Sequence, residues 1–239
     1  MLVTRPEPEA LHTLARLHAL DIPALSAPML QFRTLDTSLP GPEGFAALAL
    51  TSGNALRALE KRGVLRRYLE LPVFAVGDAT AALARSAGFG HVESARGGLR
   101  NLSEHLANAK LTGPVLYPAA RETAGDLARA LAPFGIMVVT ARVYDMVPVE
   151  TMEPEVFGQL RDGTVDAALF YSKRTAQNFV RCVAERLDTH ERRRITMLCL
   201  SEAVAEPLIE AHFVRIGLAD HPSEEAMMSL ALGFARERA

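Results

Sequence analysis

The chain has no tryptophan, only two cysteines and only four tyrosines among its 239 residues. Cys182 and Cys199 lie within or beside apolar runs, so they are expected to be small buried side chains in a reducing compartment. No run of about eighteen apolar residues occurs, so no membrane-spanning helix is expected. The opening MLVTRPEPEA lacks the apolar core of a secretion signal, which favours a cytoplasmic location.

Sequence motifs for common cofactors are missing as well. Neither G-x-G-x-x-G after a strand nor G-x-x-x-x-G-K-[ST] occurs, and residues 88–90 (GFG) follow a helical run, which is typical of a helix end. The seven histidines form no closely spaced pair, and there is no C-x-x-C and no G-x-S-x-G. We therefore expect no cofactor, no metal and no serine nucleophile.

Charge gives no general attraction to nucleic acid or to an acidic membrane, because the formal net charge is −2. The basic run at 191–194 (ERRR) lies between a helical run and a strand run. It is interpreted as a solvated loop and not as a nucleic-acid patch. Attraction of an anionic ligand must therefore be local.

Short apolar runs typical of strands alternate with amphipathic runs typical of helices along most of the chain. This alternation predicts an α/β fold with parallel sheets covered on both faces by helices, joined by right-handed connections. The expected strands are 2–4, 46–50, 73–76, 92–94, 115–117, 137–140, 167–170, 196–200 and 214–216. The expected helices are 8–20, 54–61, 80–87, 125–134, 176–186, 202–212 and 224–235.

Two extended, proline-bounded stretches, 27–33 (APMLQFR) and 141–148 (ARVYDMVP), interrupt the alternation and lack a following helix. The block between them has a usual size for one domain. We therefore expect a discontinuous α/β domain at 1–32 and 148–239, an inserted α/β domain at 36–140, and the two stretches as hinge connectors. A single large doubly wound sheet is the alternative.

A recurring corner appears where expected strands end: an apolar strand stops at a small or hydroxyl residue and a helix follows. Free backbone N–H groups and the helix dipole make such corners suitable for carboxylates or phosphates. The alternative for each corner is a simply capped helix. Arg5, Arg57, Arg121, Lys173 and Arg174 lie at or just after strand ends and could pair with carboxylates, or could be solvated surface charges. The corner candidates are Ser52, Gly53, Asn54, Gly77, Ser172, Lys173 and Ser201.

Seven motifs then occur in order: VTRP at 3–6, PML at 28–30, TSGNALRAL at 51–59, AVGDATAALARSAGF at 75–89, VYDMVP at 143–148, LFYSKRTAQNF at 169–179 and CLSEAVAEPL at 199–208. In this order and spacing the chain resembles the uroporphyrinogen-III synthase family over nearly its whole length. The resemblance implies a bilobal fold of two flavodoxin-like or Rossmann-like α/β/α domains joined by a two-stranded β hinge.

The resemblance also implies a hydro-lyase activity without cofactor or metal. The family cyclises hydroxymethylbilane, a linear tetrapyrrole carrying acetate and propionate groups, to uroporphyrinogen III with inversion of the terminal ring and loss of water. Its reaction is thought to pass through an azafulvene cation and a spirocyclic pyrrolenine. A monomer is expected, with substrate handed over by the preceding deaminase.

By the same resemblance, Tyr144 matches the family's candidate acid, and Ser52, Thr80 and Ser172 match ligand-contacting hydroxyls. The alternative for Tyr144 is a hinge tyrosine whose hydroxyl satisfies a backbone group. Some family positions differ here: Ala203 and Val204 stand where some members carry threonine, Ala120 stands where glycine often precedes the basic residue, and Lys173 stands where proline is common.

Two alternative functions remain. One is a catalytically silent tetrapyrrole-binding or regulatory module of the same fold, but Ser52, Thr80, Tyr144 and Ser172 are all present, which favours the enzyme. The other is a two-lobed small-anion receptor of the periplasmic-binding type, which the expected lack of a secretion signal argues against.

Overall fold

The computed structural model describes residues 1–123 and 125–238 and contains two separate sheets. The chain divides into two compact units, each described here by itself. Unit 1 comprises Met1–Gln31 and Val147–Ala239, and unit 2 comprises Phe32–Met146. Two sheets exclude the single doubly wound sheet, and the expected α/β class with parallel strand pairs is confirmed.

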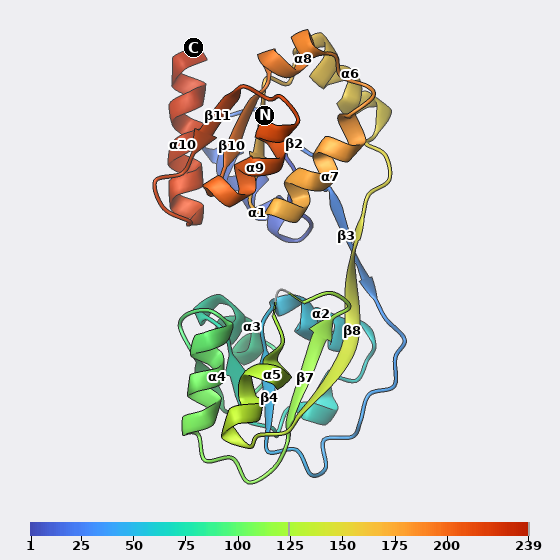
Figure 1. The fold of residues 1–239 in the computed structure, drawn as a ribbon, viewed down its shortest axis with the longest axis vertical. Coiled ribbons are helices and arrows are strands. Elements are labelled where there is room, and N and C mark those ends of the chain that lie inside the picture. Colours follow the sequence, from blue (N-terminus) through green and yellow to red (C-terminus); the bar gives the residue numbers. More distant parts are fainter. Residues whose placement is uncertain (124, 239) are drawn as a thin grey trace. The chain divides into compact units, whose positions relative to one another are not determined.

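Unit 1 is built on a five-stranded parallel sheet in the order β11-β10-β9-β1-β2 (Figure 1). Its strands are β1 (Leu2–Val3), β2 (Leu25–Ser26), β9 (Ala167–Phe170), β10 (Thr196–Cys199) and β11 (Arg215–Leu218). Its helices are α1 (Glu9–Ala19), α6 (Pro154–Asp162), α7 (Lys173–Val183), α8 (Thr189–Arg194), α9 (Glu202–Glu210) and α10 (Glu224–Arg238).

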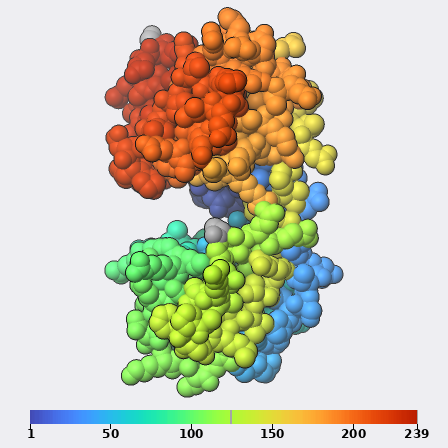
Figure 2. Space-filling view, viewed as in Figure 1, coloured from blue at the N-terminus to red at the C-terminus, as the bar shows by residue number. Residues whose placement is uncertain are grey.

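Successive strand residues of unit 1 enter two different cores, because side chains alternate between the faces of a sheet. Ala168 and Phe170 of β9 pack with side chains of α6, α7 and α9 on one face. Ala167 and Leu169 pack with side chains of α1 and α10 on the other face. In the space-filling view, the orange and red part of the chain, which includes α7 to α10, forms most of the visible surface of this unit (Figure 2).

Unit 2 is built on a six-stranded sheet in the order β3-β8-β7-β4-β5-β6. The pairs from β8 to β6 are parallel. Its strands are β3 (Leu30–Thr34), β4 (Ala47–Leu50), β5 (Val73–Ala75), β6 (Val92–Ser94), β7 (Val115–Ala120) and β8 (Val138–Pro148). Its helices are α2 (Gly53–Lys61), η1 (Leu65–Tyr68), α3 (Asp78–Ser86), α4 (Leu99–Asn108), α5 (Leu127–Leu131) and η2 (Ala132–Phe134).

The two faces of the unit 2 sheet are covered in the same way. Leu48 and Leu50 of β4 pack with α2 and α3 in one cluster, which also contains Tyr144. Ala47 and Ala49 pack with α4 and α5 in the other cluster, which contains Tyr117. The two tyrosines therefore belong to opposite faces of one sheet.

The chain passes between the units within two strands. It leaves unit 1 after Gln31, inside β3, and returns at Val147, inside β8. These strands are neighbours in the six-stranded sheet, and the Leu35 N–H donates to the Val143 carbonyl at 2.9 Å.

Three expectations about local structure were wrong. The solvated loop at 191–194 is part of helix α8, which is started by a capping box between Asp188 and Glu191. The D-x-x-E spacing of that box is a helix-start signal in the sequence. Residues 137–140 and 141–148 are not two segments, because β8 runs without a break through almost all of both. Helix α6 follows this stretch after a short link, although no helix was expected there.

Helix α4 was not anticipated, since its sequence LRNLSEHLAN is largely polar and buries only Leu102, Ser103 and Leu106. The expected helix end at 88–90 is confirmed: Gly88 follows α3 with φ +103°. Both cysteines are buried and unpaired, as expected. Within the described part of the chain, no helix is long and apolar enough to cross a membrane.

Candidate functional site

Helices begin directly after four strands, at the residues that the corner pattern indicated. Ser52 caps α2 after β4, and its Oγ accepts a hydrogen bond from the Asn54 N–H at 3.2 Å. Ser172 caps α7 after β9, and its Oγ accepts from the Thr175 N–H at 3.2 Å. Because the strands are parallel, corners of one unit share the carboxyl edge of its sheet, where α/β folds bind ligands.

Gly77 and Ser201 begin α3 and α9 without a side-chain hydrogen bond at the cap. A Cβ added at Gly77 would meet no atom within 4 Å, so packing does not require glycine there and the backbone is open to approach. A Cβ at Gly53 would lie 2.4 Å from Cδ1 of Leu83, so a larger residue there would require the exposed Leu83 side chain to move. The segment that follows β7 includes residue 124, which lies outside the described residues.

A pocket of about 340 Å³ opens at the carboxyl edge of the unit 2 sheet. It is lined by residues at the ends of β4, β5 and β7, by Tyr144 within β8 and by Leu99 at the start of α4. It combines phenol, hydroxyl and carboxyl groups with a few apolar side chains. Its lining residues are Thr51, Ser52, Val76, Leu99, Tyr117, Ala120, Glu122, Thr123, Gly125 and Tyr144.

Tyr144, on β8, is only 6% exposed and stacks on Phe32, with the ring centroids 5.7 Å apart. Burial raises the pKa of its hydroxyl above the ordinary value of 10.0. A hydrogen bond with the Ser52 side chain opposes this increase in pKa, as expected where the serine hydroxyl donates to the phenolic oxygen. Charge on Tyr117 would raise the pKa further. The Tyr144 phenol is therefore held in its protonated form.

Tyr117 and Thr51 form a second hydroxyl pair in the same pocket, with 2.9 Å between their oxygens. Sequence reasoning did not select either residue. The available signal was position: Thr51 directly precedes the capping Ser52, and Tyr117 is the last residue of the expected strand 115–117. That the two side chains meet depends on the pairing of β4 with β7.

The pocket brings together only two of the predicted residues, Ser52 and Tyr144. Thr80 is buried within α3 and does not line the pocket. The Arg121 backbone N–H donates to the Tyr144 carbonyl at 2.8 Å, while its guanidinium lies 3.4 Å from Asp145 and is 63% exposed. Asn54 Nδ2 lies 3.8 Å from the Met146 sulfur. Gly53, Asn54, Gly77 and Arg121 adjoin the pocket without lining it.

Arg5, in unit 1, is held by a network at the carboxyl ends of β1 and β9. Its Nη1 lies 2.6 Å from Glu224 Oε2 and donates to Thr13 Oγ1 at 3.1 Å. Its guanidinium lies 4.1 Å from the centre of the Tyr171 ring. The Tyr171 hydroxyl donates to Glu224 at 3.2 Å, and burial is the main reason that the pKa of Tyr171 is about 12.

Two other predicted residues in unit 1 have protein partners. Lys173 forms an ion pair with Glu206 on α9, and this hydrogen bond raises the pKa of the lysine. The Ser172 hydroxyl also lies 2.7 Å from Thr175 Oγ1. Ser201 has no side-chain capping bond.

The described residues were compared with the requirements of a metal site and of a reactive thiol. The described residues include no group of three His, Cys, Asp or Glu side chains placed to hold a metal ion. Burial raises the pKa of the Cys199 thiol to about 12, and burial also raises the pKa of Cys182. Neither thiol is therefore prepared to act as a nucleophile.

Comparison with known proteins gives the family. A profile described as uroporphyrinogen-III synthase HemD matches residues 12–229. A uroporphyrinogen-III synthetase from Helicobacter pylori is 23% identical with a TM-score of 0.70, covering 89% of this chain and 93% of that chain. A mutant uroporphyrinogen III synthase from Thermus thermophilus is 19% identical with a TM-score of 0.53, covering 98% of this chain and 97% of that one. The two structures share the fold, and because the profile spans most of the sequence, the chain belongs to the uroporphyrinogen-III synthase family.

Proposed function

We propose that this chain converts hydroxymethylbilane into uroporphyrinogen III, closing the linear tetrapyrrole with inversion of its last ring and loss of one water. Membership of the synthase family supports this activity and a role in tetrapyrrole and heme biosynthesis. The reaction is that of a cyclising hydro-lyase, because a carbon–oxygen bond breaks and water leaves. The observation that carries the assignment of residues is the buried Tyr144 hydroxyl in the unit 2 pocket.

Tyr144 is the proposed general acid. Its hydroxyl gives a proton to the hydroxymethyl oxygen, the carbon–oxygen bond breaks, and water leaves. A phenol whose pKa is raised by burial is fully protonated at neutral pH, so the proton is available. The Ser52 hydroxyl, which is hydrogen-bonded to Tyr144, stabilises the phenolate that forms. The ring carbon that closes the macrocycle later loses its proton, which restores the phenol.

The other pocket groups suit the cation that remains after water has left. The hydroxyl oxygens of Thr51 and Tyr117 and the carboxyl group of Glu122 line the same pocket. Oxygen atoms and a carboxylate stabilise a positive charge that develops beside them. Most of the remaining rate enhancement is expected from holding the folded tetrapyrrole in position for ring closure. The N-terminal ends of α2 and α3 at Ser52 and Gly77 are the proposed contacts for its carboxylates.

We further propose that the protein acts as a monomer in the cytoplasm and receives its substrate from the preceding deaminase. Two buried, unpaired cysteines suit a reducing compartment. The net charge of −2 favours neither nucleic acid nor an acidic membrane as a partner.

The decisive test is product identity. Freshly generated hydroxymethylbilane is supplied to the purified protein, the products are oxidised, and porphyrin isomers I and III are separated by chromatography. The proposal expects isomer III in excess. Isomer I alone, the product of spontaneous closure, would instead support the catalytically silent module.

The pH dependence of turnover follows from the pKa of Tyr144. Burial raises this pKa above 10, and the acid form is the active one, so kcat is expected to be flat from about pH 7 to about pH 10 and to fall only at higher pH. Ser52→Ala removes the group that lowers the pKa, so it should move the alkaline fall further upward. A fall in kcat centred between about pH 6 and 8 would point to another acid.

Arg5 is the proposed carboxylate contact of unit 1. Glu224 and Thr13 both interact with Nη1, whereas Nε and Nη2 form no hydrogen bond or ion pair with the described residues. The Nε–Nη2 side of a guanidinium is the fork that binds a carboxylate in a bidentate manner. Glu224 and the Tyr171 ring hold the group in place, so they act as positioning residues.

Arg5→Gln is expected to raise the KM for hydroxymethylbilane about tenfold with little change in kcat, because a charge-assisted hydrogen-bonded pair is lost. Glu224→Gln should raise KM in the same direction, and the double variant should be no worse than Arg5→Gln alone. The neighbouring Glu225→Gln is the matched control, because Glu225 is exposed and its ion pair, at 3.7 Å, is with Arg16 and not with Arg5. A lower Tm with unchanged KM in both single variants would reduce the network to a structural role.

A further inference from the structure

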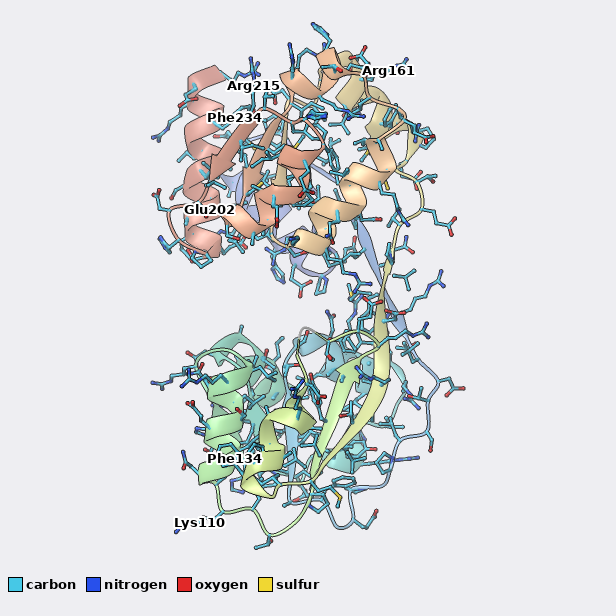
Figure 3. The ribbon with its side chains drawn as sticks, viewed as in Figure 1. Lys110, Phe134, Arg161, Glu202, Arg215 and Phe234 are labelled. Atoms are coloured by element: carbon cyan, nitrogen blue, oxygen red, sulfur yellow. The ribbon has the colours of Figure 1, made fainter. Side chains whose placement is uncertain are left out.

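Unit 1 has a pocket at the amino-terminal edge of its five-stranded sheet, opposite to the edge that carries the helix corners. It has a volume of about 290 Å³, and residues at the start of β11, the end of α8 and the end of α10 line it. Figure 3 labels Arg215, at the start of β11, at one end of this unit and Glu202, at the start of α9, nearer the other end. The lining residues are Leu160, Asp162, Gly163, Val165, Asp166, Arg194, Ile195, Arg215 and Arg238.

Three arginines from three different elements line this pocket, and Arg215 has unused donors. Arg215 makes no hydrogen bond or ion pair with the described residues, and it is exposed. Arg194 donates through Nη2 to the Arg161 carbonyl at 2.5 Å. Like charges in one pocket repel each other, and a bound anion removes that cost.

The pocket's two aspartates do not supply that anion in full. Asp166 lies 3.6 Å from Arg238, and Asp162 accepts from the Thr164 N–H at 2.9 Å. The Thr164 hydrogen bonds are the main reason that the pKa of Asp162 is lowered, with smaller contributions from Arg194 and Arg161. Three arginines against two aspartates leave one positive charge uncompensated. Arg215, which is exposed and has no hydrogen bond or ion pair with the described residues, is the group left to receive a ligand.

We propose that this pocket binds a phosphate group, either as inorganic phosphate or as a phosphomonoester. The three arginines belong to α8, β11 and α10, and a tetrahedral oxyanion has enough oxygens to accept from each of them. A carboxylate offers two oxygens in one plane and matches this arrangement less well. The bound anion ties α8, β11 and α10 together and stabilises unit 1. This site is separate from the carboxylate contacts at the other edge of the sheet and does not depend on the proposed activity.

The test measures phosphate binding to the full-length protein by calorimetry and by thermal unfolding, with sodium chloride keeping the ionic strength constant. Saturable binding and a rise in Tm are expected with inorganic phosphate, with glycerol 3-phosphate, or with both, and the comparison identifies the source. Arg215→Gln is expected to weaken binding about tenfold, because one charged donor group is lost. Arg236→Gln is the matched control, since Arg236 is an arginine of the same helix as Arg238 and does not line the pocket.

Arg194→Lys gives a second variant that keeps the charge and removes the guanidinium group from the pocket. It should also weaken binding, and far-UV circular dichroism shows whether the variant is folded. The proposal is overturned by a Tm rise that chloride reproduces at equal ionic strength. It is equally overturned by phosphate affinity that is unchanged in Arg215→Gln.

Discussion

Replacing Tyr144 with phenylalanine is expected to lower kcat for uroporphyrinogen III formation about a hundredfold, the lower end of the usual contribution of a general acid. The hydroxyl is the group that donates the proton in the proposed reaction, and the ring that packs against Phe32 is kept. Binding of the product should change much less than turnover, because the side chain keeps its shape. Rates of isomer III formation and the product dissociation constant are the two measurements.

Tyr68→Phe provides the matched control for this substitution. Tyr68 is a fully buried tyrosine of the same unit, and its hydroxyl donates to the Pro40 carbonyl at 2.7 Å. It does not line the pocket, so its loss should reduce stability by about 1 kcal/mol and leave kcat unchanged. If Tyr144→Phe turns over like the wild type, Tyr144 is not the acid, and its hydroxyl serves only to satisfy Ser52.

Asn178→Asp is expected to lower the free energy of unfolding at pH 7 by about 3 kcal/mol. Asn178 is 5% exposed, and its Nδ2 donates to the carbonyls of Met29 at 2.5 Å and of Val149 at 3.0 Å. A carboxylate at this position would face two carbonyl oxygens with no donor of its own. Arg181, whose Nη2 also donates to Val149, offsets only part of this cost because it is exposed.

The pH dependence of this loss identifies its cause. Burial against carbonyl oxygens raises the pKa of the new carboxyl in the folded state above its unfolded value of about 3.9. The deficit is therefore smallest below about pH 4, where both states are protonated, and it grows as the pH rises towards the folded-state pKa. Denaturant unfolding at several pH values measures it. Gln177→Glu, the same chemical change at the exposed neighbouring position, should have almost no effect, and an equal loss in both variants would contradict the argument.

The alternation of apolar and amphipathic runs was sufficient to predict most elements. β6 and β9 begin and end at the residues expected from the sequence. Helices α2, α7 and α9 follow strands, with Ser52, Ser172 and Ser201 as their N-cap residues. These features are local, because strand periodicity and helix capping depend on residues only a few positions apart. Helix α8 was missed although its D-x-x-E capping signal is equally local, since the ERRR run was weighed by charge alone.

The contents of the candidate site were beyond the reach of local patterns. Tyr144 and Ser52 were selected from the sequence, and Thr51 and Tyr117 were not, yet all four line one pocket. Conversely, Thr80 was selected, and α3 buries it away from that pocket. Whether a side chain reaches a pocket depends on which strands are neighbours and on their register, which residues distant in the sequence determine.

By itself, then, the sequence determined the alternating α/β elements, the capped corners at strand ends and, through its ordered motifs, the family. Only the tertiary structure decided that Arg5 is held by Glu224 and that Tyr144 and Ser52 line one pocket. It also decided that Arg194, Arg215 and Arg238 share one pocket. The physical reason is that propensity, periodicity and capping act over one or two turns of chain. Burial, hydrogen-bond partners and pKa depend instead on contacts between segments tens to hundreds of residues apart.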